Sequence, residues 1–166
     1  MSARADFYPD RLLRRLVGRG VDFVVVGGMA MVLHGSARVT HDLDICYSSD
    51  PTNLDLLGSV LVELGAKLRG VEDDIPFVPD GRTLRRTAIL TLDTPEGRID
   101  LLFQPAGAPS YDELRRRAMR MDLGGFGALI ASLDDLAAMK RAAGRPIDLI
   151  DLEEIEVIRR LGGGGG

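Results

Sequence analysis

The chain alternates between two spacings of apolar residues, one typical of helices and one typical of strands. Segments whose apolar residues lie three or four apart predict helices over 9–19, 29–33, 51–64, 111–119, 132–144 and 147–161. Segments of continuous or alternating apolar residues predict strands over 23–26, 42–47, 87–92 and 98–103, with one more short strand between 121 and 130. Turn residues at 93–97 predict a hairpin of the third and fourth strands, and the Gly-, Pro- and Asp-rich stretch 70–83 predicts a loop.

This order of elements, with helices between both buried and hairpin strands, predicts an α/β or α+β fold. Its centre would be one mixed β-sheet flanked by helices. The length of 166 residues suits one domain. We expect a core over 1–131, a C-terminal helical pair over 132–161 packed on that core, and a disordered glycine tail over 162–166.

Composition restricts the compartment and the partners. The net charge is −4, and positive charge is concentrated only at Arg115, Arg116, Arg117 and Arg120. That cluster would meet RNA phosphates or form a solvated helix face. No apolar run reaches the roughly 18 residues that a membrane span requires, and the first ten residues lack the apolar core of a secretory signal. The single cysteine, Cys46, excludes an internal disulfide and leaves the redox compartment open. A reducing cytosol is the simplest interpretation, so we predict a cytoplasmic protein with no membrane partner.

Three acids lie inside apolar strand segments. Asp42 and Asp44 are two residues apart and share one strand face, with Cα atoms about 6.5–7 Å apart. They repel each other and need a positive charge, which Mg²⁺ would supply because it takes carboxylates and phosphates as ligands. Asp100 is isolated within the apolar segment 98–103, and a neighbouring strand would bring it beside them. Asp-x-Asp pairs also occur in solvated turns, and Asp100 has Arg98 as an alternative partner, but together the acids favour a metal site.

Gly27 and Gly28 follow the buried strand 23–26 and precede a predicted helix. Glycine permits positive φ, and exposed amides at a helix start can hold phosphate. The dinucleotide-binding pattern Gly-x-Gly-x-x-Gly is not present at 27–32. The simpler alternative is a tight strand-to-helix turn. Thirteen residues separate Gly28 from Asp42.

At this spacing the sequence resembles the polymerase β superfamily of nucleotidyltransferases. The residues that carry the resemblance are Val26-Gly27-Gly28, then Asp42-Leu43-Asp44-Ile45, with Asp100 as the third carboxylate. The similarity extends over about residues 20–155 and is greatest to minimal nucleotidyltransferases and AbiEii-like toxins of toxin–antitoxin pairs. It implies a nucleotidyltransferase fold that binds an NTP such as ATP. Gly28 stands where the family often has serine, so a side-chain hydroxyl for the phosphates is absent.

Lys140 lies on the apolar stripe of the predicted helix 132–144, so it either snorkels past its neighbours or reaches a buried acid or a phosphate. The segment 139–152 resembles the lysine–Gly-Arg–Asp signature of AbiEii-like proteins. That resemblance implies that Lys140 contacts nucleotide phosphate, with Asp148 or Asp151 as its partner, and does not choose between the two acids. Arg38, four residues before Asp42, is a candidate phosphate clamp or a surface arginine.

The expected activity is transfer of an NMP from an NTP to an acceptor hydroxyl, with two Mg²⁺ ions as cofactors. The expected catalytic and metal-binding residues are Asp42, Asp44 and Asp100. The expected nucleotide-binding residues are Gly27, Gly28, Arg38, Lys140, Asp148 and Asp151. The acceptor would be a tRNA 3′ end or a protein, and the protein could be the toxin of a toxin–antitoxin pair with a cognate antitoxin as partner. The alternatives are an aminoglycoside-type small-molecule acceptor, a catalytically silent relative that binds nucleotide or a partner, and an interaction domain that binds no nucleotide.

Overall fold

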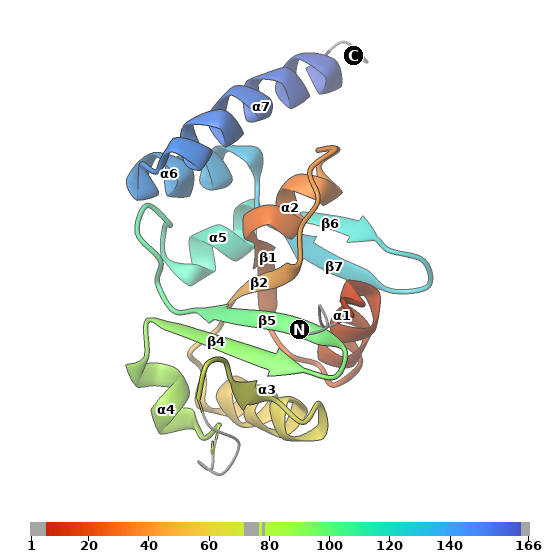
Figure 1. Ribbon diagram of the computed structural model, residues 1–166, viewed down its shortest axis with the longest axis vertical. Coiled ribbons are helices and arrows are strands. Elements are labelled where there is room, and N and C mark those ends of the chain that lie inside the picture. Colours follow the sequence, from red (N-terminus) through yellow and green to blue (C-terminus); the bar gives the residue numbers. More distant parts are fainter. Residues whose placement is uncertain (1–5, 72–76, 78, 164–166) are drawn as a thin grey trace.

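The computed structural model describes residues 6–71, 77 and 79–163. Its centre is a mixed sheet of seven strands in the order β3-β4-β5-β2-β1-β7-β6 (Figure 1). In chain order the strands are β1 (Phe23–Val26), β2 (Asp42–Tyr47), β3 (Lys67–Leu68), β4 (Ile89–Thr94), β5 (Gly97–Leu102), β6 (Met119–Asp122) and β7 (Gly127–Ile130). Strands β2 and β5 pair in parallel, as do β1 and β7, whereas the other pairs are antiparallel. The predicted mixed sheet is therefore confirmed.

The helices of the described part of the chain are α1 (Pro9–Gly18), α2 (Gly27–Leu33), α3 (Pro51–Glu63), α4 (Gly81–Arg86), α5 (Tyr111–Arg117), α6 (Leu133–Ala143) and α7 (Pro146–Gly163). Figure 1 shows α3 and α4 at the β4–β5 end of the molecule, with α6 and α7 packed together at the opposite end. None of these helices is both long enough and apolar enough to cross a membrane.

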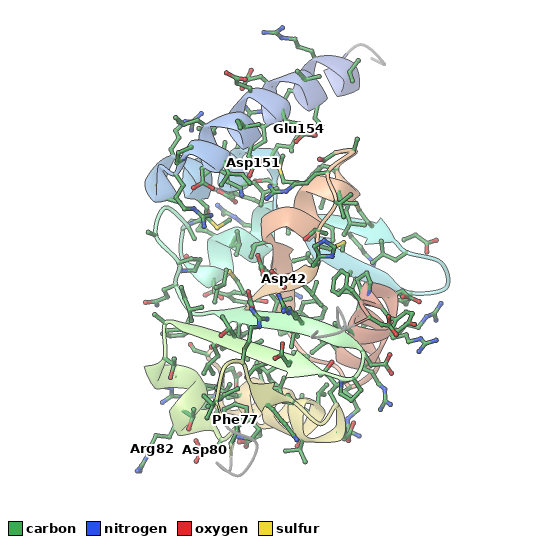
Figure 2. All side chains as sticks on the ribbon, viewed as in Figure 1. Asp42, Phe77, Asp80, Arg82, Asp151 and Glu154 are labelled. Atoms are coloured by element: carbon green, nitrogen blue, oxygen red, sulfur yellow. The ribbon has the colours of Figure 1, made fainter. Side chains whose placement is uncertain are left out.

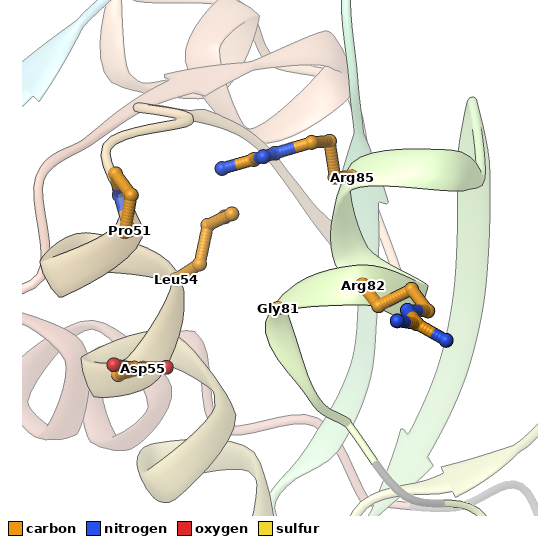
Figure 3. A pocket seen from close by; sticks show the side chains of 6 residues that line it. All are labelled: Pro51, Leu54, Asp55, Gly81, Arg82 and Arg85. Carbon is orange, nitrogen blue, oxygen red and sulfur yellow. The ribbon is translucent and has the colours of Figure 1, made fainter.

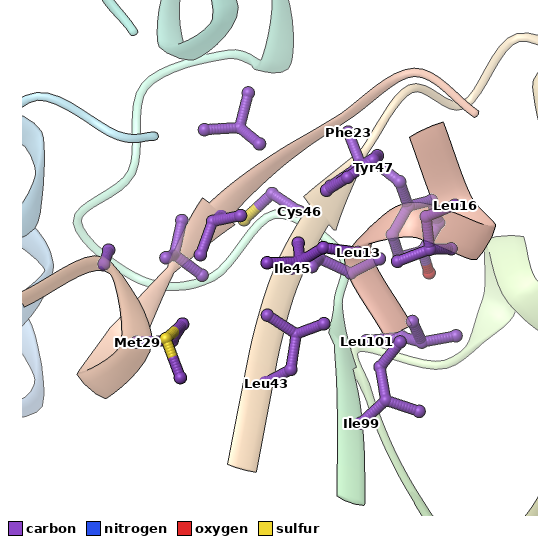
Figure 4. Packing of buried hydrophobic residues seen from close by; sticks show 14 of the residues in the cluster. Leu13, Leu16, Phe23, Met29, Leu43, Ile45, Cys46, Tyr47, Ile99 and Leu101 are labelled. Carbon is purple, nitrogen blue, oxygen red and sulfur yellow. The ribbon is translucent and has the colours of Figure 1, made fainter. Parts of the chain in front are cut away.

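The strands β2 and β5 direct apolar residues to one face and acids to the other. Leu43 and Ile45 on β2, with Ile99 and Leu101 on β5, are fully buried in the main core, where Leu13 and Leu16 of α1 also lie (Figure 4). Because side chains alternate along a strand, the acids between these residues point to the opposite face. Burial of each large apolar side chain stabilises the fold by about 1.5–3 kcal/mol. The core therefore fixes which way the acids face.

The structure differs from the sequence expectations at several places. Between 70 and 83, where a loop was expected, Asp80 caps α4 by accepting a hydrogen bond from the Thr83 amide, and residues 72–76 and 78 lie outside the described residues. The two-residue strand β3 was not expected. In place of the single short strand expected between 121 and 130, the structure has a hairpin of two strands, β6 and β7. The preceding helix α5 ends at Arg117, where Ala118 adopts an extended conformation that leads into β6.

Two further differences concern element ends. The hairpin of β4 and β5 has a shorter turn than expected, since Thr94 already pairs with Gly97 and its hydroxyl donates to the Gly97 carbonyl at 2.8 Å. Gly162 and Gly163, expected in the disordered tail, continue α7, and the remaining tail residues 164–166 lie outside the described residues. The C-terminal pair α6 and α7 begins and ends close to the expected boundaries.

Candidate functional site

The three predicted acids lie on adjacent strands. In the parallel pairing of β2 with β5, Asp44 is directly opposite Asp100, and Asp42 is opposite Arg98. Figure 2 shows Asp42 near the middle of the molecule. The strand pairing that the core imposes thus brings together acids that are more than fifty residues apart in the sequence.

The electrostatics of these acids are unfavourable without a cation. Burial, together with the negative charges of Asp100 and Asp42, raises the pKa of Asp44 to about 7. Burial also raises the pKa of Asp100, against the opposing effect of Arg69. One oxygen of Asp42 and one of Asp44, the Oδ1 atom in each, are buried without a hydrogen-bond partner. Buried polar atoms are normally paired, so these two unpaired oxygens are suited to bind a cation.

The donor atoms of the acids fit a divalent metal, although the acids are not already arranged around one point. Carboxylate oxygens are the ligands that a hard cation such as Mg²⁺ takes, and two of them are unpaired here. Among the described residues, however, no group of three or more His, Cys, Asp or Glu side chains is already arranged as a metal site. The metal therefore stays a prediction, supported by the two unpaired oxygens.

The glycine turn lies directly against Asp44. Gly27 has φ +66°, and a Cβ built on it would be 2.1 Å from the Asp44 Oδ2 atom. A Cβ on Gly28 would meet the Thr40 hydroxyl at 3.0 Å, so the segment before β2 passes close over this turn. Only glycine permits both the positive φ and the close approach at position 27. The glycine turn therefore lies close to Asp44, and its phosphate-binding role stays a prediction.

A network of buried ion pairs holds Lys140. Its ammonium lies 2.8 Å from Asp151 Oδ2 and 3.5 Å from Asp148 Oδ1. Arg38 also donates to Asp151 Oδ2, at 2.6 Å, and its phosphate-binding role stays a prediction. Arg145 binds Asp148 and lowers the pKa of that acid to about 2. Asp148 and Asp151 are almost completely buried. Asp151 is therefore the nearer partner of Lys140, and Asp148 is shared with Arg145.

A cavity of about 370 Å³ connects these parts. Of the predicted site residues, those that line it are Gly27, Asp44, Asp100, Lys140 and Asp148. Its apolar walls are Val26, Ile89, Leu102, Pro105, Ala106, Leu136, Met139 and Ala143. Asp42, Gly28, Arg38 and Asp151 are outside the lining, although Asp42 neighbours Asp44 on β2 and Asp151 holds Lys140. A cavity lined by acids, a lysine and apolar side chains suits a phosphorylated ligand with an apolar part.

One functional candidate was missed by the sequence analysis. Arg69 follows β3, and its guanidinium Nη2 lies 3.0 Å from Asp100 Oδ1 and 3.9 Å from Asp42 Oδ1. Nothing in the local sequence marks this arginine, because its place depends on how β3 pairs with β4.

A second cavity, of about 450 Å³, lies between α3 and α4 (Figure 3). It is lined by Pro51, Leu54, Asp55, Gly81, Arg82 and Arg85. None of the predicted site residues lines it, so the acids and the glycine turn point to the cavity beside β5 and α6 as the candidate site.

The chain matches the family model for nucleotidyltransferases of unknown function (DUF6036) over residues 10–162. Among solved structures it is similar to the crystal structure of ANT(2″)-Ia in complex with adenylyl-2″-tobramycin, with 14% identity, 92% of this chain and 93% of that chain covered, and a TM-score of 0.54. It is also similar to the candidate nucleotidyltransferase TM1012 from Thermotoga maritima, with 16% identity, 95% and 96% covered, and a TM-score of 0.51. No curated protein matches the chain. At these identities the solved structures establish the fold, and the predicted nucleotidyltransferase fold is confirmed.

Proposed function

The chain belongs to the DUF6036 family of nucleotidyltransferases, and we propose that it transfers an NMP from an NTP to the hydroxyl of an acceptor. The observation that carries this proposal is the register of Asp44 against Asp100, beside Gly27 and in one cavity with Lys140. Phosphoryl transfer is catalysed mainly by positioning and by charge stabilisation, which such a site supplies.

In this proposal Asp42, Asp44 and Asp100 would hold two Mg²⁺ ions. When bound, Mg²⁺ supplies the positive charge that both the carboxylates and a triphosphate require. The amides of Gly27 and Gly28 lie at the start of α2, where they would donate to phosphate oxygens.

The remaining roles belong to two charged side chains. Lys140, oriented by Asp151 and Asp148, contributes positive charge to the phosphates. Asp100 accepts the proton of the acceptor hydroxyl. The hydroxyl oxygen then forms a bond to the α-phosphorus, the bond from that phosphorus to the bridging oxygen breaks, and pyrophosphate leaves.

The acceptor is the least constrained part of the proposal. The arginines of α5 that would meet a tRNA are paired within the protein: Arg115 binds Asp22, Arg116 binds Glu113 and Arg117 binds Asp135. These pairs weaken the argument for RNA, and a protein hydroxyl stays the alternative within the same expectation. A toxin role with a cognate antitoxin rests on the sequence resemblance alone.

A small-molecule acceptor is favoured by one specific similarity. ANT(2″)-Ia, whose fold this chain shares, was solved with adenylyl-2″-tobramycin. The apolar walls of the cavity and its volume of about 370 Å³ also suit a small ligand. We therefore keep an aminoglycoside-type acceptor as the second candidate.

The test incubates the purified protein with each α-labelled NTP, Mg²⁺, and in turn total tRNA, a cell lysate or an aminoglycoside mixture. The site variant is Asp42→Ala/Asp44→Ala, and the matched control is Asp55→Ala, which removes an exposed acid from α3. Label transferred to one acceptor class, and lost only in the site variant, would establish the activity and the acceptor together. Absence of transfer with intact NTP binding would favour the silent relative, whereas absence of NTP binding would favour the interaction domain.

A further inference from the structure

Arg69 is held in place by groups that lie outside the three predicted metal ligands. Its amide donates to the Thr91 carbonyl at 2.9 Å. Its Nε atom donates to Asp93 Oδ1 at 3.1 Å, and its Nη2 atom donates to the Leu92 carbonyl at 3.2 Å. These three contacts with β4 aim the guanidinium at the acids of β5 and β2.

The same guanidinium hydrogen-bonds one carboxylate oxygen that a metal would need and lies near a second. Its Nη2 atom lies 3.0 Å from Asp100 Oδ1 and 3.9 Å from Asp42 Oδ1, and the Arg69 side chain is only 24% exposed. That Asp42 oxygen has no hydrogen-bond partner, so Arg69 is near it without satisfying it. A cation coordinated by these oxygens would lie beside the guanidinium, and two positive charges at such a distance repel each other strongly where water is scarce.

We propose that Arg69 is the built-in counter-cation of the acid group and competes with the divalent metal for Asp42 and Asp100. This inference rests on the proposed function, because it assumes that these acids bind a metal. The contact with Asp93 lets Arg69 give up Asp100 without losing every acidic partner. Metal binding and the Arg69–Asp100 ion pair then exclude each other, so Arg69 sets the metal concentration at which the site becomes occupied.

Arg98 provides a matched control on the same strand face. It lies directly opposite Asp42 in the strand pairing, is 48% exposed, and its Nε is 3.7 Å from the same Asp93 oxygen. Its removal lowers the local positive charge by the same amount as removal of Arg69. Because the Arg98 side chain is exposed and its charge is screened, this control reports the effect of removing one surface charge near the site, whereas direct competition would be specific to Arg69.

The experiment measures Mn²⁺ binding to the nucleotide-free protein by electron paramagnetic resonance, with Mg²⁺ as the competing ion. Arg69→Gln is expected to bind Mn²⁺ about tenfold more tightly than wild type, because the acids lose the positive charge of Arg69 that competes with the metal. Arg98→Gln is expected to change the affinity by less than about twofold, because exposed pairs are screened. Without metal, Arg69→Gln should melt at a lower temperature than wild type, and Mg²⁺ should raise its melting temperature more than it raises that of wild type.

Affinity in Arg69→Gln no higher than in Arg98→Gln would overturn the proposal. If Arg69→Gln does not fold, Arg69→Met decides, since methionine keeps part of the apolar stem but removes the charge; unchanged metal affinity in that variant would also overturn the proposal. Transfer activity without tighter binding in the Arg69 variants would refute the competition and leave the proposed function intact. Tighter binding in the Arg69 variants, together with no transfer by the wild-type protein to any acceptor class, would support the competition and refute the function.

Discussion

Replacing Gly27 with alanine would drive a methyl group into the carboxylate of Asp44. The added Cβ would lie 2.1 Å from Oδ2 and 2.9 Å from Cγ of that residue, and φ at this position is +66°. A non-glycine residue in this backbone region costs about 1–2 kcal/mol. Overpacking of this kind adds about 1–3 kcal/mol, because Asp44 is held on a strand between two neighbours and cannot move freely.

The expected loss is therefore about 2–5 kcal/mol, which corresponds to a fall in melting temperature of roughly 4–20 °C for a chain of this size. Two other glycines separate the two causes. Gly20 has φ +77° with no atom within 4 Å of an added Cβ, so Gly20→Ala should show the backbone cost alone. Gly18 has open space and no positive φ, so Gly18→Ala should be nearly neutral.

The assay is thermal unfolding followed by circular dichroism in the presence of a chelator, for all three alanine variants. Gly27→Ala would also be measured in an Asp44→Ala background, where removal of the carboxylate should recover part of its cost. The reasoning is refuted if Gly27→Ala melts at the same temperature as Gly20→Ala, or if the Asp44→Ala background makes no difference.

Three more predictions concern single side chains. Asp100→Asn should fold normally yet lose at least about 100-fold in transfer rate; full activity in that assay would remove Asp100 from the mechanism. Asp151→Asn should cost about 3–5 kcal/mol in a urea titration, because it leaves Lys140 and Arg38 without their shared buried partner; an unchanged midpoint would mean that Asp148 suffices. Burial raises the pKa of the Cys46 thiol to about 12, so alkylation at pH 8 should be at least about 100-fold slower in the native than in the denatured protein.

Much of the site followed from local patterns. Alternation placed the acids of 42–47 and 98–103 on one face each, and the core that Leu43 and Ile99 share makes those two faces the same one. The glycine turn was predicted for its backbone freedom, and the structure adds the close approach to Asp44. Such features are readable from sequence because they depend on residues two to four positions apart.

The parts that were missed depend on pairings distant in the sequence. The strand β3 has two residues, too few for any periodicity, and it exists only because Lys67 and Leu68 pair with β4. Arg69 reaches the acids through that pairing and so carried no local signal. The ion pair of Arg38 with Asp151 carried no local signal for a similar reason, since Asp151 lies 113 residues later, and the phosphate-binding role of Arg38 stays a prediction.

That long separation has a consequence for the synthesis of the protein. The three carboxylates and the glycine turn leave the ribosome well before α7, yet Lys140 and Arg38 gain their shared partner only once Asp151 has been made. A nascent chain that stops at Gly144 carries the acids without the pairing that orients Lys140. A product terminated before Asp151 would therefore carry the acids and the glycine turn but lack the carboxylate that holds Lys140 and Arg38.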